Sequence, residues 1–570
     1  LYSTVNNWLN LWSGYNYIQL NENVDKADVL DHLEAINIEQ YSDKEDYQFV
    51  FKLQALNDIT PGPLMSNEIG PGLPLIFVYF LGGLALLVML SAAFNYMNLS
   101  IARALTRARE VGVRKVAGAT RLHLIMQFLI EAIVLSLIAL VFSYGLLTFL
   151  KPAFSQLHFS EMLRWDLRVD QEVILLSILF SILVGFMAGI IPALTLSALQ
   201  PSKVLKQLSG IKLFSKLGLR KALIISQFSL SLIFIISTTL VYNQLQLMLG
   251  ADFGYRTNGI TNIRLHDSSY EQLRTELEKY PQIATVSAAS HIPASGTSSE
   301  ISVKLQLEDE DERSINLFRV DENYVDALEL NILAGTNFKI LDPAANEILV
   351  NEQCVKDYGF GTAHEALGQY IIDADDSTNY KIVGVLSDYY HKMLVMDQAP
   401  MMLLYRPDNL NIMHVVSASD NTQELNSIID KAYEEVNPGL IIDKQSMEQE
   451  LAFYYDFLFG DISKVTGLAP VLALVIACLG LLGIATYTIE TKTKEVGIRK
   501  VLGANEKQLI LHLSKGFFMI ILIAILVAVP MAYLLNDLWL QQLAYRVDIT
   551  AGVILFSVSV LALLGVITIG

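Results

Sequence analysis

The sequence predicts a multi-pass α-helical membrane protein that carries α+β domains outside the membrane and is built from two related halves. Three observations predict this fold class. The 570 residues are 53% hydrophobic and only 17% charged, which is too apolar for an ordinary soluble protein. The apolar residues gather in long runs that are separated by two polar regions. A block of mixed charged and apolar residues, Thr106–Ala119, returns as Thr491–Ala504.

Seven apolar runs are each long enough to cross a bilayer, since a helix of about 20 residues spans ~30 Å of hydrocarbon. They lie near residues 74–97, 122–150, 171–197, 222–243, 464–488, 516–535 and 550–570. The polar regions between them are 1–73 and about 243–462. The second of these is long enough to enclose a hydrophobic core of its own.

The basic residues predict the orientation in the membrane. Three short stretches are rich in Lys and Arg, namely 98–121, 198–221 and 489–513, whereas the loop 536–549 carries only Arg546. Short basic loops stay in the cytoplasm. With seven spans, the segments predicted to lie outside are 1–73, 151–170, 243–462 and 536–549.

The net charge of −18 comes mainly from the outer region 243–462, which has 36 Asp and Glu against 14 Lys and Arg. This balance suits a solvated exported domain, and attraction of a cationic cargo is the alternative. It disfavours a nucleic-acid partner. The two cysteines, Cys354 outside and Cys478 in a span, cannot form a disulfide with each other on this topology, and no spacing of Cys or His indicates a metal site.

The outer region mixes two periodicities, which indicates an α+β domain. Helical spacing occurs at 271–280 and 424–436. Alternating or β-branched segments at 301–307, 347–350 and 380–385 predict strands. Gly335, Gly359 and Gly361 are expected in turns.

We expect the sequence to be truncated at both ends. It starts with Leu1 in a segment that is placed outside without a preceding signal or span, and its last apolar run reaches Gly570. One further span at the front would make eight, or two sets of four.

The two halves align with an offset of 385 residues. From Thr106 to Ile125, 11 of 20 positions are identical to Thr491–Ile510. The predicted domains are a C-terminal part of a first outer domain (1–73), a first three-span module (74–197), a basic cytoplasmic linker (198–221), the first span of a second module (222–243), a second outer domain (244–462) and a second three-span module (463–570).

The repeated block has the pattern of a short amphipathic helix. Its valines supply an apolar face, its charges lie between them, and a glycine suits its end. It is either a charged anchor that only sets topology or a docking element for a cytoplasmic partner. Repetition at matching positions favours docking, because topology requires charge without fixing its order. The candidate site residues are Glu110, Gly112, Arg114, Lys115 and Gly118, with Glu495, Gly497, Arg499, Lys500 and Gly503.

Several motifs resemble the MacB/FtsX-type permease subunits of ABC transporters, in the two-module, eight-span form of Bacteroidetes-like bacteria. The motifs are the block Glu495-Val-Gly-Ile-Arg-Lys-Val-Leu-Gly-Ala504, Asn95-Tyr-Met-Asn98, Leu199-Gln-Pro-Ser-Lys-Val-Leu-Lys206, Arg220-Lys-Ala-Leu-Ile-Ile-Ser-Gln-Phe228, Val320-Asp-Glu-Asn-Tyr324, Ala334-Gly-Thr-Asn-Phe338 and Val383-Gly-Val-Leu-Ser-Asp388. They occur in the family's order along essentially the whole chain.

The resemblance implies FtsX-like modules, MacB-like periplasmic core domains and a location in the bacterial inner membrane, among its lipids, with the large domains in the periplasm. It implies a dimer of ABC ATPase subunits that acts on coupling helices at about 107–119 and 492–504. The chain has no Gly-x-x-x-x-Gly-Lys-Ser/Thr loop, so we expect no ATPase activity and no cofactor in it, with ATP and Mg²⁺ on the partner. A periplasmic adaptor and an outer-membrane channel are further implied partners.

Other functions stay open from the residues alone. The family also suits an ATPase-driven regulator that activates a periplasmic cell-wall hydrolase, and a receptor without an ATPase is a third class. An enzyme in the outer region would have to use Ser387, Asp388 and His391, but neighbours in sequence rarely form a catalytic triad.

Overall fold

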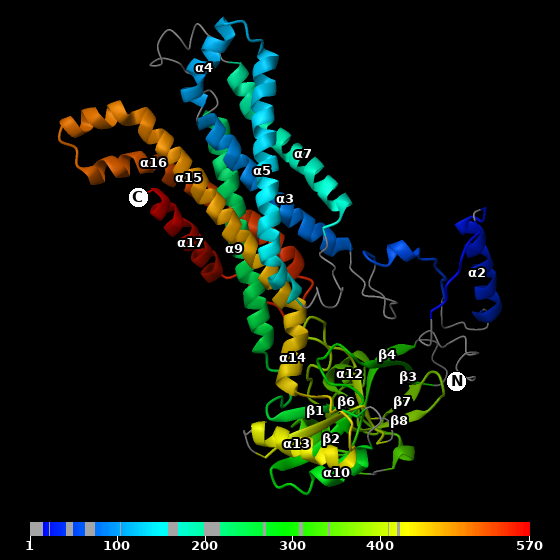
Figure 1. The fold of residues 1–570 in the computed structure, drawn as a ribbon. Helices are drawn as coiled ribbons and strands as arrows, with labels where there is room; N and C mark the ends of the chain where they lie inside the picture. Colours follow the sequence, from blue (N-terminus) through cyan, green and yellow to red (C-terminus); the bar gives the residue numbers. More distant parts are fainter. Residues whose placement is uncertain are drawn as a thin grey trace. The chain divides into compact units, whose positions relative to one another are not determined.

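The computed structural model describes residues 15–21, 23–41, 49–62, 75–102, 104–157, 169–198, 217–265, 269–306, 312–339, 342–407, 410–418 and 422–569 (Figure 1). The side chains of some helical stretches, 101–109 and 483–495 among them, lie outside this description. The chain forms two compact units, one of residues 1–230, 471–521 and 565–570 and the other of 231–470 and 522–564.

Seven helices within the described residues are long and apolar enough to cross a membrane, as predicted. Their apolar spans are Val78–Ser100, Arg121–Ser155, Gln171–Ser197, Lys221–Leu249, Asp461–Leu482, Phe518–Leu540 and Ala551–Thr568. The helices that contain them are α3 (Leu75–Ala102), α5 (Arg121–Ser155), α7 (Gln171–Ser197), α9 (Leu217–Leu249), α15 (Asp461–Val501), α16 (Glu506–Leu540) and α17 (Ala551–Ile569). Ahead of them lie α2 (Lys26–Tyr41) and the short η1 (Leu56–Asp58).

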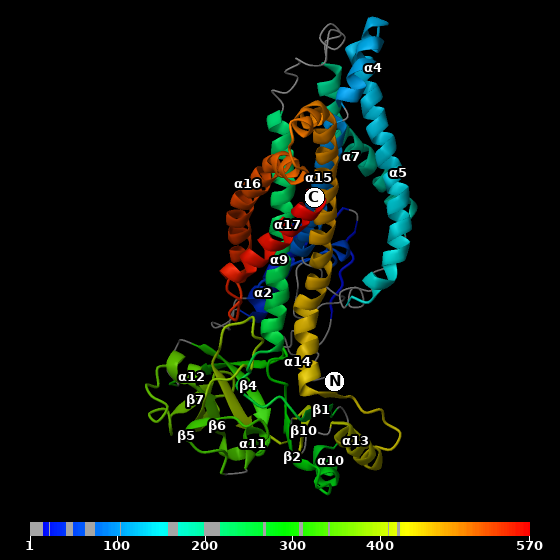
Figure 2. The ribbon, with the colours of Figure 1, turned by 90° about the vertical axis from the view of Figure 1, so that its left-hand side faces the viewer.

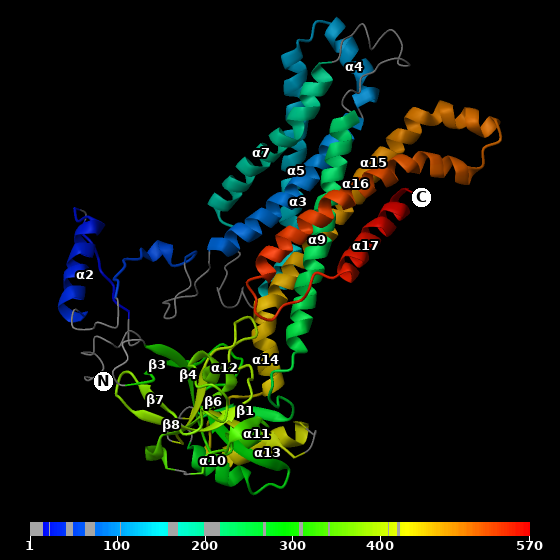
Figure 3. The same cartoon turned by 180° about the vertical axis from the view of Figure 1, so that it is seen from behind.

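Small residues let α5 and α7 pack closely, and the two helices lie side by side (Figure 3). A Cβ added at Gly185 would lie 2.7 Å from the Cα of Ile133, and one at Gly189 would lie 2.7 Å from the Cβ of Ala132. The hydroxyls of Ser136 and Ser181 are 2.9 Å apart in the same contact. Close approach of backbones at small residues is typical of helix pairs in membranes.

The last helix of the outer domain is followed by two further helical segments without an intervening loop (Figure 2). The three are α14 (Met447–Tyr455), the π-helical segment η3 (Asp456–Gly460) and α15. At 1.5 Å per residue, the 41 residues of α15 alone extend over ~60 Å. One element therefore runs from the outer domain through the span into the block.

The outer domain lies between α9 and α15 in the sequence and is built on a mixed sheet. Its strands are β1 (Ile260–Arg264), β2 (Ile283–Ala289), β3 (Ser299–Lys304), β4 (Arg313–Val320), β5 (Ile332–Gly335), β6 (Glu347–Asn351), β7 (Tyr370–Asp373), β8 (Asn379–Leu386), β9 (Met401–Tyr405), β10 (Ile412–Ser417) and β11 (Lys444–Ser446). Its helices are α10 (Tyr270–Leu277), α11 (Tyr324–Ala327), α12 (Glu352–Asp357) and α13 (Thr422–Val436), with the 3-10 turn η2 (Pro343–Ala345).

The strands follow the order β11-β1-β10-β2-β4-β3-β7-β8-β6-β9, and β9 also pairs in parallel with β4. The pairing from β4 through β3, β7, β8, β6 and β9 therefore closes on itself, and β5 adds to β8. Aliphatic side chains such as Ile315, Ile348 and Ile382 form a buried core on this ring. A closed ring leaves few unpaired strand edges.

The remaining strands β11, β1, β10 and β2 are covered by α10 and α13, which lie next to each other in Figure 1. Leu273, Leu277, Ile429 and Ala432 of these helices pack on the strands in one buried cluster. The predicted helices at 271–280 and 424–436 and the predicted strands at 301–307, 347–350 and 380–385 are all confirmed within a few residues. Gly335, Gly359 and Gly361 all have positive φ, which glycine adopts easily. Gly359 lies in a turn as predicted, whereas Gly335 is the last residue of β5 and Gly361 lies in the loop after α12.

Candidate functional site

The first repeated block forms a short helix with a defined end. It is α4 (Ala104–Val116), slightly ahead of the predicted 107–119. Gly118 follows it with a φ of 95°, and the amide of Ala119 donates to the carbonyl of Arg114 at 3.0 Å while that of Gly118 donates to Lys115 at 3.1 Å. This pair of bonds is a Schellman cap, which needs a residue that adopts the left-handed conformation easily.

The second block ends in the same way but begins differently. Gly503 has a φ of 91°, and the amides of Ala504 and Gly503 donate to Arg499 and Lys500 at 2.9 and 3.1 Å. Residues 492–501 are not a separate short helix but the last turns of α15. The second block is thus a direct extension of a span, while its end has the same geometry as the first.

The inner face of α4 is held against α5 and α7. Val111 is buried among Leu124, Phe128 and Leu129 of α5 and Ala193 and Leu196 of α7. The Lys115 ammonium donates to the carbonyl of Ser197 at 2.6 Å, close to the end of α7. The Nε of Arg121 donates to the hydroxyl of the same serine at 3.4 Å. A cation at a helix C-terminus satisfies carbonyls that the helix cannot pair itself.

Arg114 makes two contacts next to this packing of α4 on α5 and α7. It forms an ion pair with Glu110 at 2.7 Å, one turn earlier on α4, and it donates a hydrogen bond to the side-chain oxygen of Gln127 on α5. Both Glu110 and Arg114 are about half exposed. Arg114 and Lys115 therefore fix α4 to its neighbours, whereas the ion pair of Glu110 lies within α4.

The outer face of each block is apolar and exposed. Val113 is 56% and Val116 69% exposed in the first block. Their counterparts in the second block, Ile498 and Val501, are 54% and 88% exposed, and Leu502 is 80% exposed. Aliphatic side chains are thus presented at equivalent positions of both copies. Exposed apolar clusters with polar neighbours are typical of interaction sites.

The structure accounts for the predicted site residues in different ways. Arg114, Lys115 and Gly118 have the contacts described above, and Gly497 is an exposed helical residue with open space where a Cβ would lie. Gly112 lies within α4. Arg499, Lys500 and Gly503 lie at the end of α15, whereas the side chain of Glu495 lies outside the described part of the chain, as do residues 199–206 of the basic linker.

A second feature connects the outer domain to the loop between α16 and α17. The amides of Ala544 and Tyr545 donate to the carbonyls of Val395 and Leu394, each at 3.2 Å. The buried side chain of Gln244, near the outer end of α9, donates to the carbonyl of Tyr545 and accepts from the amide of Val547, both at 2.8 Å. Trp539, Leu543 and Tyr545 also pack on the main core of the outer domain.

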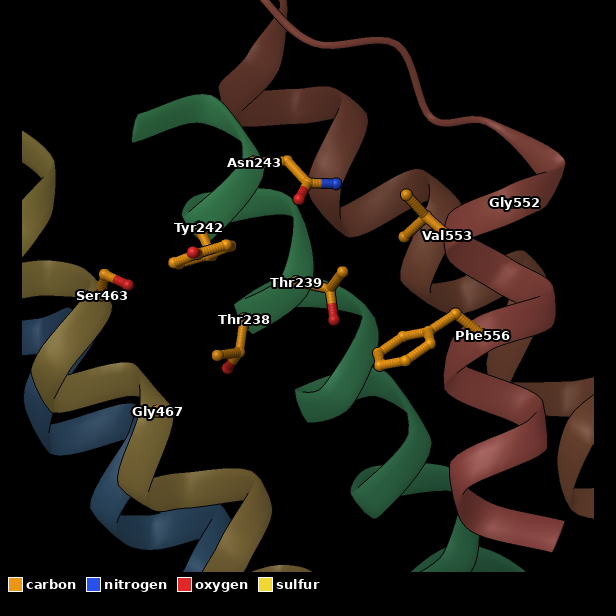
Figure 4. Close-up of a pocket in the computed structure, with 9 residues that line it drawn as sticks. All are labelled: Thr238, Thr239, Tyr242, Asn243, Ser463, Gly467, Gly552, Val553 and Phe556. Carbon is orange, nitrogen blue, oxygen red and sulfur yellow. The ribbon is translucent and has the colours of Figure 1, made fainter. Parts of the chain in front are cut away.

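An open cavity of about 610 Å³ lies among three span helices (Figure 4). Its lining comes from α9, α15 and α17 and consists of Thr238, Thr239, Tyr242, Asn243, Ser463, Gly467, Gly552, Val553 and Phe556. None of these side chains is charged. The cavity therefore offers hydroxyl, amide and aromatic groups but no ionic contact for a charged solute.

The structure does not assemble the enzyme-like set in the outer domain. The Asp388 carboxylate accepts from the Asn351 side chain at 2.9 Å and from the amide of Gln353 at 3.0 Å. The His391 ring is buried, and no hydrogen-bond partner reaches it within the described residues. Burial and the nearby Lys392 lower the pKa of His391 to about 4. A neutral, unpartnered ring is not oriented as a base.

No group of His, Cys, Asp and Glu in the described residues could hold a metal ion. Cys354 and Cys478 are free thiols, and burial raises the pKa of the Cys354 thiol well above its usual range. Among the described residues, the candidate functional features are therefore the two blocks, the loop contact at Gln244 and the open cavity.

The sequence identified the two repeated blocks. It did not indicate which residues of each block contact the rest of the chain and which are exposed. The signal for the exposed face was present, since Val113 and Val116 align with Ile498 and Val501. The contacts of Lys115 and Gln244 join residues far apart in the sequence, and no local pattern indicates them. Arg114 and Lys115 already bond to other residues of the chain. The exposed aliphatic residues beside them are therefore the better candidates for binding a partner.

Two family profiles match this chain over most of its length. The family described as FtsX-like permease C-terminal matches residues 82–201 and again 467–570. The MacB-like periplasmic core domain matches residues 222–434. The double match agrees with the repeat of the two halves.

Curated relatives match shorter stretches. The ABC transporter permease YknZ of Bacillus subtilis is 30% identical over 131 residues, which is 23% of this chain and 32% of the relative. The macrolide export ATP-binding/permease protein MacB of Bdellovibrio bacteriovorus is 32% identical over 126 residues, which is 22% of this chain and 19% of that protein. The match thus spans about a third or less of these relatives' own length.

Solved structures of single domains are also similar in part. The match to the periplasmic region of MacB from Actinobacillus actinomycetemcomitans covers 35% of this chain and 94% of the matched chain, with 15% identity and a TM-score of 0.26. The match to a domain of a permease protein from Porphyromonas gingivalis covers 33% of this chain and 89% of the matched chain, with 15% identity and a TM-score of 0.25.

Proposed function

Since the chain belongs to the MacB/FtsX-type family of ABC transporter permeases, we propose that it transmits force from a separate pair of ATPase subunits to its outer domain. ATP and Mg²⁺ would bind to those subunits, and this chain would supply no catalytic group. The observation that carries the proposal is the exposed apolar face of the two blocks, which is the same in both copies although only one block forms a separate helix.

The contacts of the first block would transmit a displacement of α4 to the neighbouring helices. Lys115 attaches α4 to the end of α7, and Arg114 attaches it to α5. Arg121, at the start of α5, bonds to the same serine of α7. A partner that binds Val113 and Val116 would therefore move the α5–α7 pair together with α4. An aliphatic face of this size fits a groove in a partner better than it fits water.

Two connections would carry motion to the outer domain. The first is the helical path from Met447 to Val501, which begins in the outer domain core, where Leu451 and Tyr455 are buried. The second is the loop after α16, which is bonded to Leu394 and Val395 of the outer domain. Displacement of α15 or α16 therefore reaches the same domain by two routes.

We propose that the outcome is export or extraction of a substrate at the periplasmic side of the bacterial inner membrane. The uncharged lining of the open cavity supports this rather than a conduit for a hydrophilic solute. A periplasmic adaptor and an outer-membrane channel would complete the assembly, and macrolides, named for several relatives, are the first substrates to test. Activation of a periplasmic cell-wall hydrolase is the alternative output of the same motion.

The test is capture of the partner through the apolar faces. Full-length chain is isolated from native membranes with Mg-ATP, and proteins that carry an ATP-binding loop are identified by mass spectrometry. We expect such a protein with the wild-type chain and its loss with the double variant V116D/V501D, because a buried carboxylate at each contact opposes docking.

Two further variants make the result specific. I441D places the same charge on a highly exposed aliphatic residue of the outer domain and is expected to retain the partner. K115A removes the attachment to Ser197 and is expected to retain the partner but to lose coupling of ATP hydrolysis to transport. Unchanged capture by V116D/V501D would refute docking through these faces.

A further inference from the structure

The last helix of the outer domain, α14, carries a buried carboxylate. Glu450 is only 2% exposed, whereas Glu448 and Gln449 on the same helix are exposed. Its neighbours Met447 and Leu451 are buried in the main core of the outer domain. A carboxylate is costly to bury unless other groups pair with it, so the partners of Glu450 decide what it does.

Two residues of β1 pair with this carboxylate. The side-chain nitrogen of Asn262 donates to Oε2 of Glu450 at 2.9 Å, and the guanidinium of Arg264 donates to Oε1. Arg264 is about one third exposed and also lies 3.6 Å from the carboxylate of Asp443. Residues two apart on a strand lie on the same face of the sheet. The carboxylate is therefore held at both oxygens by one face of β1.

Further buried polar side chains follow on the neighbouring strands. Because the Asn262 nitrogen donates to the carboxylate, its oxygen faces Nδ1 of His414 at 2.8 Å. An amide oxygen only accepts, so Nδ1 carries the proton. On β10, His414 lies directly opposite Asn262, and on β2, Ser287 lies directly opposite His414. Ser287 donates to Asp321, just after β4, at 2.7 Å. A buried polar row thus lies across the sheet between Glu450 and the end of β4.

This arrangement favours one setting of α14 on the sheet. A slip by one residue turns a helix by ~100°, which would place Gln449 or Leu451 against β1 in place of Glu450. The carboxylate would then lose both donors in apolar surroundings, which is strongly unfavourable. Apolar contacts such as that of Leu451 have no direction and oppose a slip less. Buried polar pairs are used in this way to specify the register of packed elements.

We propose that Glu450 is a positioning residue that fixes the register of α14 on the outer-domain sheet through Asn262 and Arg264. A displacement of α15 is then transmitted to β1 and β10 without slippage of α14. The purpose of the register rests on the proposed transmission of force. The register itself is a property of this chain and can be measured without the ATPase.

The distance between two spin labels in the purified full-length chain tests the register. One label is placed at S427C on α13, which packs on the sheet, and the other at F453C on α14, both at exposed positions. The background is C478A, and the buried thiol of Cys354 does not react. We expect one distance with Glu450 present and a second distance in E450A. A slip by one residue moves a group ~5 Å from the helix axis by ~8 Å, which the measurement resolves.

E448A is the matched control, because Glu448 is an exposed glutamate on the same helix, and it is expected to show one distance. E450Q keeps the shape and one accepting oxygen, and N262A removes one donor, so both should show a smaller second population than E450A. These two variants take over the test if E450A is not recovered folded. One distance in E450A, or in both E450Q and N262A, would overturn the proposal even if the thermal midpoint falls. Two distances in the wild type or in E448A would overturn it as well.

The register and the docking of the ATPase can fail separately. Loss of partner capture in V116D/V501D, with a second distance in E450A, would leave both proposals standing. Unchanged capture with that second distance would refute only docking, and loss of capture with one distance in E450A would refute only the register.

Discussion

Single residues set the ends of the two blocks. Gly118 and Gly503 both adopt positive φ and close the same pair of backbone hydrogen bonds. The two glycines have the same conformation at equivalent positions. This shows that the backbone at the end of each block needs a residue that adopts positive φ easily. The sequence predicted this role from position alone, since a glycine after an amphipathic run is typical of a helix end.

Alanine at either cap is expected to destabilise the block locally. G118A or G503A forces a side chain into the left-handed region, which costs ~1 kcal/mol. Hydrogen exchange of the Ala119 and Ala504 amides should then accelerate by roughly five-fold, by the conversion of ~1 kcal/mol. G497A is the control, because this glycine is helical with open space around it and should become neutral or slightly more protected.

Buried histidines make the outer domain sensitive to acid. Burial lowers the pKa of His391 to about 4 and that of His414 to about 3. Because both rings protonate at higher pH once unfolded, near the usual 6.5, the folded state binds fewer protons between these values. Their contribution to stability is complete above pH 6.5 and decreases as the pH falls towards 4.

Asp321 acts in the opposite direction. Burial raises its pKa to about 6, although Tyr270 and Ser287 donate hydrogen bonds to the carboxylate. Its folded pKa exceeds the unfolded value, so its contribution is complete below pH 4 and is lost as the pH rises through 6. Burial also lowers the pKa of His291 and raises those of Asp373 and Asp388. Because the pKa values of His391 and His414 are displaced furthest, we expect a net loss of outer-domain stability between pH 6.5 and 4.5.

The measurement is the urea midpoint for proteolytic cleavage within residues 243–462 at both pH values. H391L should reduce the loss on acidification, because its ring has no hydrogen-bond partner among the described residues to forfeit. H364L changes an exposed histidine and should leave the pH dependence unaltered. An equal pH dependence in H391L and the wild type would exclude His391 as a cause.

At the scale of elements, the second block differs from its prediction. A short separate helix was expected at 492–504, but α15 continues through the span to Val501. Helical periodicity and composition cannot distinguish two helices from one, since no Pro or Gly interrupts the pattern in a way that requires a break. The continuity is what connects the second block to α14 and the outer domain.

The loop contact at Gln244 is a further connection between elements. Replacing Gln244 by Ala removes the partner of the Tyr545 carbonyl and of the Val547 amide, both in half-buried residues, and each lost hydrogen bond costs ~0.5–1.5 kcal/mol. We expect faster hydrogen exchange across residues 541–549 in Q244A, with little change in β4 or β9. Unchanged exchange in the loop would mean that Gln244 does not hold it.

Most of the fold was predictable from sequence, whereas most of the site was not. The seven spans follow from apolar length, and the helices and strands of the outer domain follow from periodicity. The closed strand ring joins β4 to β9, which lie more than 80 residues apart, and only tertiary packing determines such a pairing. The attachment of Lys115 to Ser197 is hidden for the same reason.

At the scale of the whole molecule, the sequence predicts that the two blocks face the cytoplasm and that the outer domain faces the other side of the membrane. The basic residues beside the blocks predict the cytoplasm, and the acidic region 243–462 with its MacB-like core domain is extracytoplasmic. Force that arrives at Val116 and Val501 would then be used on the far side of the bilayer.

The most direct test is labelling of single introduced cysteines with a membrane-impermeant maleimide, with the unmodified chain as the background. I441C in the outer domain and V501C in the second block are both at highly exposed positions. We predict that I441C is labelled in cells with only the outer membrane opened, and that V501C is labelled only after the inner membrane is also permeabilised. Labelling of V501C from outside, or protection of I441C there, would contradict the account.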